Sequence, residues 1–287
     1  MTNPIQDLRV AALQTDLHWE NPKANALNIE RQMDSMNGDT DLIVLPEMWA
    51  TGFSMKPDKI AMEWDDRWRA SPDQWPAPLR AMLDWSQKKN AAVVGSLSCK
   101  IMRGKRLVNR CFFVSPTHEL DWYDKRHLFV FAGENNVYSC GESSKTIEWR
   151  GWKLRLQICY DLRFPVFSRN RASDPYDVLI YVANWPETRV SAWKALITAR
   201  SIENQCYTIG VNRVGADGNG IAHNGCSLLL NPKGHALAQS IEDESVWIQA
   251  TLSANELIDF RTKFPVLLDA DEFEIKQKHS VPSHPSQ

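Results

Sequence analysis

Segments with the residue spacing of β-strands alternate along the chain with segments that have the spacing of α-helices, and this alternation limits the fold more than any other feature. The expected strands cover residues 8–13, 42–45, 91–98, 108–115, 120–123, 146–149, 153–158, 178–182, 207–211, 226–230 and 246–251. The expected helices cover residues 21–36, 78–89, 191–204 and 253–263. Because helices that flank many strands form layers around a sheet, we predict an α/β fold.

No internal repeat and no linker rich in Gly, Ser or Pro interrupts the 287 residues. We therefore predict a single domain over residues 1–273, a length that is ample for a sizeable core. The residues that follow, 274–287, are polar and contain proline, and we interpret them as a C-terminal tail.

A nucleophile stands at the end of one expected strand. Leu154, Leu156 and Ile158 alternate as in a strand that buries one face, and Cys159 follows directly. In α/β folds, the groups that bind and transform ligands gather at the carboxyl ends of strands. A single cysteine is more often a small inert apolar residue, so Cys159 alone does not establish catalysis.

Two further strand-like runs also end at ionisable residues. The run 42–45 leads into Glu47, and the aromatic-rich run 120–123 leads into Lys125. A carboxylate can act as a general base, a thiol as a nucleophile, and an ammonium group can stabilise an oxyanion. Either charge alone would be an ordinary solvated side chain, but three such sites together predict a catalytic centre.

The segments around these residues resemble the catalytic blocks of the nitrilase superfamily, and most closely those of its omega-amidase branch. The resemblance extends from about Leu8 to about Phe273 and rests on six blocks in the same order: LPEMWATGFSM, YDKRHLF, CYDLRFPVFSRN, YVANWP, TARSIENQCY and NRVGADGNG. Six ordered blocks are far more specific than one short motif.

This resemblance implies a fold, a reaction and an assembly. The fold is a four-layer α-β-β-α sandwich, and two copies of the chain form a homodimer. The reaction is hydrolysis of the terminal amide of small 2-oxo acid amides, such as 2-oxoglutaramate and 2-oxosuccinamate, through a thioester on Cys159. Glu47 would act as the base, and Lys125 with the main-chain N–H of Tyr160 would hold the oxyanion.

Other candidate site residues follow from their positions in these blocks. Glu134 stands where family members often carry a second Glu, and it would orient the lysine or assist proton transfer. Arg163 stands where the related branch carries an Arg, and it would bind the substrate carboxylate unless it pairs with Asp161 or another local acid. Asn184 and Trp185 follow a strand and either line the pocket or only pack.

Several nearby polar residues receive structural interpretations instead. We expect Asp161 to shape the turn after the nucleophile and Glu142 to lie on the surface. Arg200 and Glu203, three residues apart on a helix, are expected to form an ion pair. Nothing in the sequence marks His127 as a general base.

Charge and composition exclude several other classes of protein. Lys plus Arg is 33 and Asp plus Glu is 35, giving a net charge of −2 without a basic stripe, so we expect no nucleic-acid partner. No apolar run reaches the ~18 residues of a membrane span, and the N-terminus does not read as a signal peptide. The six cysteines contain no Cys-x-x-Cys pair and the seven histidines no paired spacing. We therefore expect a cytoplasmic protein with free thiols and no metal. The family resemblance implies a small-molecule amide substrate and no cofactor.

Alternative functions stay open at this point. A true nitrilase or a carbamoylase of the same superfamily would use the same Glu, Lys and Cys. A membrane-bound acyltransferase of this fold is disfavoured by the lack of spans, and a synthetase glutaminase by the lack of a second domain. An inactive binding protein that keeps the fold is disfavoured because Glu47, Lys125 and Cys159 are all present.

Overall fold

The computed structural model describes residues 4–103 and 106–276. The strands are β1 (Leu8–Gln14), β2 (Leu42–Val44), β3 (Met62–Trp64), β4 (Ala92–Ile101), β5 (Arg106–Val114), β6 (Leu120–Asp124), β7 (Thr146–Trp149), β8 (Trp152–Ile158), β9 (Val178–Ala183), β10 (Tyr207–Asn212), β11 (Val214–Ala216), β12 (Ala222–Asn224), β13 (Leu228–Leu230), β14 (Ala236–Gln239) and β15 (Val246–Leu252). The α-helices are α1 (Pro22–Ser35), α2 (Pro57–Ile60), α3 (Ala77–Lys89), α4 (Pro165–Ser168), α5 (Val190–Glu203) and α6 (Ala254–Lys263). The 3₁₀ turns are η1 (Asp66–Ala70), η2 (Pro72–Gln74), η3 (Val130–Ala132), η4 (Glu134–Asn136), η5 (Cys159–Arg163), η6 (Glu187–Arg189) and η7 (Val266–Leu268).

Within the described residues, most strands belong to two mixed sheets. The first sheet has the order β15-β1-β2-β4-β5-β6, with β3 beside β4, and the second has the order β14-β13-β10-β9-β8-β7. The centre of each sheet is parallel: β1, β2 and β4 in the first, and β8, β9 and β10 in the second. Strands β5 and β6 continue the first sheet in antiparallel pairs, so β6 points the same way as β2. Strands β11 and β12 form a separate hairpin.

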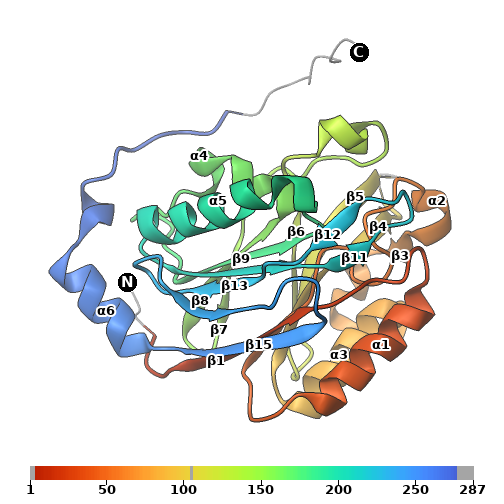
Figure 1. The fold of residues 1–287 in the computed structure, drawn as a ribbon, viewed down its shortest axis with the longest axis horizontal. Helices are drawn as coiled ribbons and strands as arrows, with labels where there is room; N and C mark the ends of the chain where they lie inside the picture. Colours follow the sequence, from red (N-terminus) through yellow and green to blue (C-terminus); the bar gives the residue numbers. More distant parts are fainter. Residues whose placement is uncertain (1–3, 104–105, 277–287) are drawn as a thin grey trace.

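Alternation along β1 shows how the sheets and helices are layered. Val10 and Ala12 belong to the apolar cluster that includes the residues of β8, β9 and β10, whereas Ala11 and Leu13 belong to the cluster with α1 and α3. Helix α5 packs on the second sheet through Trp193. Figure 1 shows α1 and α3 together on one side of the strands and α5 on the opposite side. The predicted α-β-β-α sandwich is confirmed.

The long predicted elements are present with small shifts at their ends. Helix α6 begins as expected, because the Ser253 side chain accepts a hydrogen bond from the Glu256 N–H at 3.4 Å. The predicted strand 226–230 is shorter than expected: β13 starts only at Leu228, because Cys226 has φ +60°, outside the extended region. The short elements α2, α4, β3, β11, β12 and β14 were not predicted.

The prediction that β8 buries only one face is wrong. Arg155 and Gln157, on the face opposite Leu154 and Leu156, are as inaccessible to solvent as the apolar residues. Arg155 packs over the ring of Tyr176, with its guanidinium carbon 5.0 Å from the ring centroid. Residues that follow η5 cover this outer face, so both faces of the strand are buried.

No helix among the described residues is long and apolar enough to cross a membrane. Of the predicted tail 274–287, residues 274–276 are described and have no helix or strand, and the rest lies outside the described residues.

Candidate active site

The carboxyl ends of β2, β6 and β8 bring three predicted residues together. Lys125 directly follows β6, Cys159 directly follows β8, and Glu47 comes shortly after β2. The Lys125 Nζ atom lies 2.9 Å from the Glu47 Oε1 atom, and the Cys159 thiol is close enough to both charges to be influenced by them. Because β2 and β6 belong to one sheet and β8 to the other, the cluster forms where the two sheets meet.

Glu47 is held by donors from three different segments. The Oε1 atom accepts from the Asn109 side chain at 2.8 Å and from Lys125, and the Oε2 atom accepts from the main-chain N–H of Asn184 at 2.8 Å. The Asn184 side chain in turn donates to the Glu47 carbonyl at 2.6 Å. These contacts fix a fully buried carboxylate in one orientation.

Lys125 lies between two buried carboxylates. Its Nζ atom is 2.9 Å from Glu47 Oε1 and 2.9 Å from Glu134 Oε2. Burial would lower the pKa of Lys125, but the Glu134 and Glu47 charges raise it above its ordinary value, so the ammonium group stays charged. Glu134 also accepts from the Phe129 N–H at 2.6 Å, and burial raises its pKa while Lys125 opposes that shift. The predicted contact between Glu134 and Lys125 is therefore present.

Cys159 occupies a sharp turn between β8 and η5. Its φ is +45°, a left-handed conformation that residues with a Cβ rarely adopt, and the residue is only 8% exposed. Its Sγ atom lies 3.9 Å from the Asn184 carbonyl oxygen. Burial raises the pKa of the thiol well above its ordinary value, and the Glu47 charge adds to this effect against the opposing charge of Lys125. The resting residue is therefore a neutral thiol with a carboxylate beside it.

Asp161 shapes this turn, as predicted. One carboxylate oxygen accepts from the Ile158 N–H at 3.0 Å and from the Tyr123 hydroxyl at 2.7 Å. The other accepts from the main-chain N–H of His127 at 2.9 Å and lies 2.8 Å from its Nδ1. Asp161 thus ties the turn after β8 to the segment after β6, and His127 takes part in this structural bond.

A cavity of about 260 Å³ opens above Cys159. Of the predicted residues it is lined by Tyr160, Arg163, Asn184 and Trp185, so the last two do line the pocket. It is also lined by residues that were not predicted: Phe53, Phe129, Phe131, Ala132, Pro186, Arg189, Asp217, Ile221 and His223. We call Glu47, Lys125, Glu134 and Cys159 the floor cluster, and Arg163, Trp185, Arg189 and His223 the cavity wall.

Arg163 does not pair with Asp161, whose two oxygens are occupied as described above. Its guanidinium carbon lies 4.9 Å from the Trp185 ring centroid, and no salt bridge to it forms within the described residues. Arg189 lines the same cavity, and its guanidinium carbon lies 5.4 Å from the Phe129 ring centroid and 5.2 Å from the Phe131 ring centroid. The cavity wall therefore carries two cations beside aromatic rings.

The structural roles predicted for Arg200, Glu203 and Glu142 agree with the structure. Arg200 and Glu203 form an ion pair at 3.0 Å, and Glu142 is exposed. Arg189 and His223 were missed because they belong to η6 and β12, short elements whose sequences carry no strand or helix periodicity. The segment GADGNG, which runs from β11 into the turn before β12, was part of the family resemblance. It was the sequence signal that could have placed His223 near the active site.

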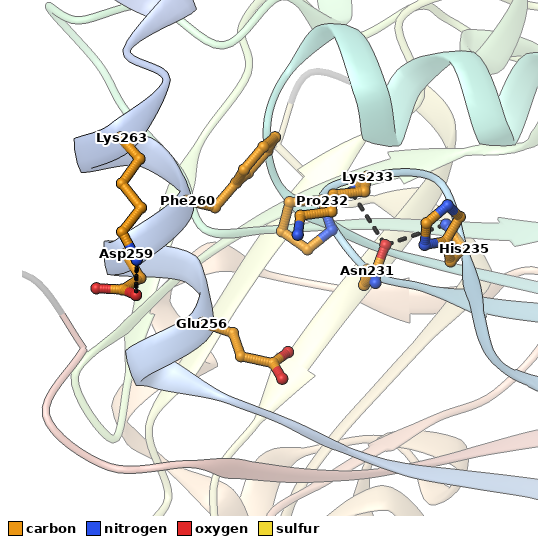
Figure 2. Close-up of a pocket in the computed structure, with 8 residues that line it drawn as sticks. All are labelled: Asn231, Pro232, Lys233, His235, Glu256, Asp259, Phe260 and Lys263. Carbon is orange, nitrogen blue, oxygen red and sulfur yellow. Dashed lines mark hydrogen bonds and ion pairs between the residues drawn. The ribbon is translucent and has the colours of Figure 1, made fainter.

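A second cavity of about 330 Å³ lies between the β13–β14 turn and α6. Figure 2 shows the side chains of Lys233 and His235 on the turn and those of Asp259 and Lys263 on the helix. The Asp259–Lys263 pair, at 2.6 Å, has side chains that are 69% and 75% exposed. These charges are solvated, unlike the floor cluster, and no cysteine lines this cavity.

The sequence is similar to those of known carbon-nitrogen hydrolases. A family model for carbon-nitrogen hydrolases matches residues 9–262. Omega-amidase YafV of Escherichia coli is 41% identical over 93% of this chain and 98% of its own length. A 2-oxoglutaramate amidase of Bacillus subtilis is 30% identical over 91% of this chain and 96% of its own length.

Solved structures show the same similarity. A CN-hydrolase superfamily protein from Xanthomonas campestris, with an arsenic adduct in its active site, has a TM-score of 0.87 and 34% identity, covering 95% of this chain and 100% of its own. Nit3 of Saccharomyces cerevisiae, a member of branch 10 of the nitrilase superfamily, has a TM-score of 0.76 and 25% identity, covering 91% and 95%.

Proposed function

The chain belongs to the carbon–nitrogen hydrolase family, and we propose that it is an omega-amidase. It hydrolyses the terminal amide of small 2-oxo acid amides, such as 2-oxoglutaramate and 2-oxosuccinamate, to the dicarboxylic acid and ammonia. The observation that carries this proposal is the Cys159 thiol at the base of a small cavity, next to buried Glu47 and Lys125.

The acylation step uses Glu47 as the general base. Glu47 accepts the thiol proton as Sγ attacks the amide carbon, because the raised pKa of Cys159 keeps the thiol protonated until the substrate arrives. The carbonyl oxygen becomes an oxyanion beside the Lys125 ammonium group and the N–H of Tyr160. Glu47 then passes its proton to the departing ammonia, and a thioester on Cys159 remains.

The deacylation step uses Glu47 as the base again. Water attacks the thioester carbon while Glu47 accepts its proton, and Glu47 then returns a proton to the departing Cys159 sulfur as the free acid forms. Loss of one oxyanion donor costs on the order of 3 kcal/mol in other enzymes. Glu134 acts through Lys125, since it holds the Nζ atom on the side away from Glu47. It is therefore a positioning residue.

Arg163 binds the carboxylate at the other end of the substrate. It lines the cavity that contains Cys159, and its planar guanidinium group can form two parallel hydrogen bonds with a carboxylate. The flat face of Trp185 beneath it limits the directions in which the group can turn. A cavity of about 260 Å³ suits a small acid amide and excludes a large acyl group.

We also propose that the enzyme is a cytoplasmic homodimer. All six cysteines are free, which is typical of proteins from reducing compartments. Light scattering at micromolar concentration should give twice the mass of the chain. An active species with the mass of one chain would refute the dimer.

Ammonia release from a panel of substrates tests the proposed reaction. The panel contains 2-oxoglutaramate, 2-oxosuccinamate, a simple aliphatic amide, an aliphatic nitrile and an N-carbamoyl amino acid. The two 2-oxo acid amides should give the highest kcat/KM. Preference for the nitrile or the carbamoyl compound would instead assign one of the other superfamily reactions, and no ammonia from any substrate would indicate a binding protein.

A further inference from the structure

His223 lines the cavity above Cys159 from the side of the β11–β12 hairpin. The residue is 4% exposed, and its Nδ1 atom is buried without a hydrogen-bond partner among the described residues. Buried polar atoms are nearly always paired, so an imidazole in this position is unusual. Nothing in the fold of the hairpin requires it, because β11 and β12 pair through their main chains.

The surroundings of His223 keep its ring neutral. Burial lowers its pKa, and the charge of Arg213, which is fully buried beside it, lowers it further. The Asp217 charge and the backbone groups of Gly215 and Ile221 oppose this shift without reversing it, and Asp217 itself accepts from the Asn219 and Ile221 N–H groups. Arg189 and Arg163 add two more positive charges to the same cavity. A second proton on the ring is therefore unfavourable near neutral pH.

A neutral imidazole has one N–H donor and one acceptor nitrogen. Because Nδ1 forms no hydrogen bond within the described residues, we assign it as the acceptor nitrogen and place the ring proton on Nε2, where it can serve a ligand in the cavity that His223 lines. Such a donor carries no charge. It suits an uncharged acceptor such as a ketone oxygen, whereas the guanidinium group of Arg163 suits a carboxylate.

We propose that His223 determines specificity by donating a hydrogen bond from Nε2 to the 2-oxo oxygen of the substrate. This inference rests on the proposed omega-amidase function and extends it to the part of the substrate that distinguishes a 2-oxo acid from a plain acid. Arg163 then binds the carboxylate of the substrate, and His223 donates a hydrogen bond to the neighbouring ketone oxygen.

Two substrates that differ only at this oxygen test the proposal. These are 2-oxoglutaramate and 4-carbamoylbutanoate, which has a methylene group in place of the ketone. In the unchanged protein, kcat/KM should favour the ketone. In His223→Phe the ratio of the two kcat/KM values should fall about tenfold, mainly through KM for the ketone, which corresponds to one neutral hydrogen bond.

Two more variants give the matched controls. His223→Gln places an amide N–H near the position of Nε2 and should restore most of the ratio, whereas His223→Asn is too short and should not. His235→Phe changes an exposed histidine at the other cavity and should leave the ratio unaltered. If circular dichroism shows that His223→Phe does not fold, the test is the difference between the kcat/KM ratios of His223→Gln and His223→Asn.

Each remaining outcome overturns the proposal. An equal loss on both substrates would show that His223 only supports the cavity wall, as would a Gln variant no better than Asn. An unchanged ratio in folded His223→Phe would remove the ketone contact altogether. If the unchanged protein cleaves 4-carbamoylbutanoate as well as the ketone, His223 is not a specificity residue although the amidase proposal stands. Failure on both amides would defeat the amidase proposal itself.

Discussion

The floor cluster and the cavity wall meet at Cys159, which lines the cavity, yet they are built in different ways. Glu47, Lys125 and Glu134 have no exposed side-chain surface, and the two carboxylates share the one ammonium group. Arg163 and Arg189 on the wall have aromatic rings beside them and no salt bridge within the described chain. A paired, buried cluster can carry chemistry that is common to all amides. Unpaired cations at the wall remain free to bind an anionic substrate.

This comparison predicts two classes of variant. Changes in the floor cluster should lower kcat for every substrate by similar factors, because the same bonds break in each reaction. Changes in the wall should alter KM and the ranking of substrates while leaving the reaction itself intact.

Cys159→Ala should have the largest effect. Without the thiol no thioester forms, so steady-state ammonia release should fall below detection, at least ~1,000-fold. The fold should be unaffected, since the side chain loses only one sulfur atom, and a circular dichroism spectrum provides that check. Cys140→Ser, at the exposed cysteine, is the control and should keep full activity. Substantial turnover by folded Cys159→Ala would refute covalent catalysis at the floor.

Glu47→Gln and Lys125→Met should each lower kcat at least ~100-fold, because one removes the base and the other an oxyanion donor. Their stabilities should differ. Lys125→Met leaves two carboxylates buried without a cation and should cost ~3–5 kcal/mol of unfolding free energy, whereas Glu47→Gln leaves the Lys125–Glu134 pair intact. Urea denaturation measures both. Equal stability of the two variants would contradict the charge arrangement described for the floor.

Glu134→Gln should have an intermediate effect, with kcat about tenfold lower and KM little changed, because Lys125 keeps its charge but loses one of two anchors. The loss should be the same factor for 2-oxoglutaramate and for a simple amide. A loss confined to one substrate would move Glu134 from the floor to substrate binding.

Arg163→Lys should have the smallest effect on chemistry and the clearest effect on selection. KM for 2-oxoglutaramate should rise roughly tenfold, since Lys cannot form two parallel hydrogen bonds with the carboxylate. KM for a neutral amide of similar length should stay within about twofold. Equal losses on both substrates would mean that Arg163 supports the turn after Cys159 and does not bind the carboxylate.

The floor cluster was easier to predict from the sequence than the wall. Glu47, Lys125 and Cys159 each follow a strand-like run, and in α/β folds functional groups gather at the carboxyl ends of strands. Glu134 required the resemblance to a family, because it lies in a 3₁₀ turn without periodicity. The direction in which charges shift the pKa of Cys159 could not be predicted from the sequence, since it depends on distances between residues of two sheets.

Arg189 and His223 could not be predicted because η6 and β12 are short elements without sequence periodicity, and only tertiary packing brings them to the cavity. The burial of Arg155 and Gln157 was missed for a related reason. The alternation of apolar residues in β8 predicts the face between the two sheets, but the outer face is covered by Ser168, Asp174 and Tyr176, which lie outside the strand. Local patterns thus predict where strands end, and tertiary packing decides what surrounds those ends.

The most direct test of the central claim is to locate the acyl group during turnover. The protein is mixed with 2-oxoglutaramate, quenched in acid within the first turnovers, digested and analysed by mass spectrometry. The account predicts a thioester adduct on the peptide that contains Cys159, absent from Cys159→Ala. An adduct on Cys99, Cys111, Cys140, Cys206 or Cys226, with the Cys159 peptide unmodified, would contradict it.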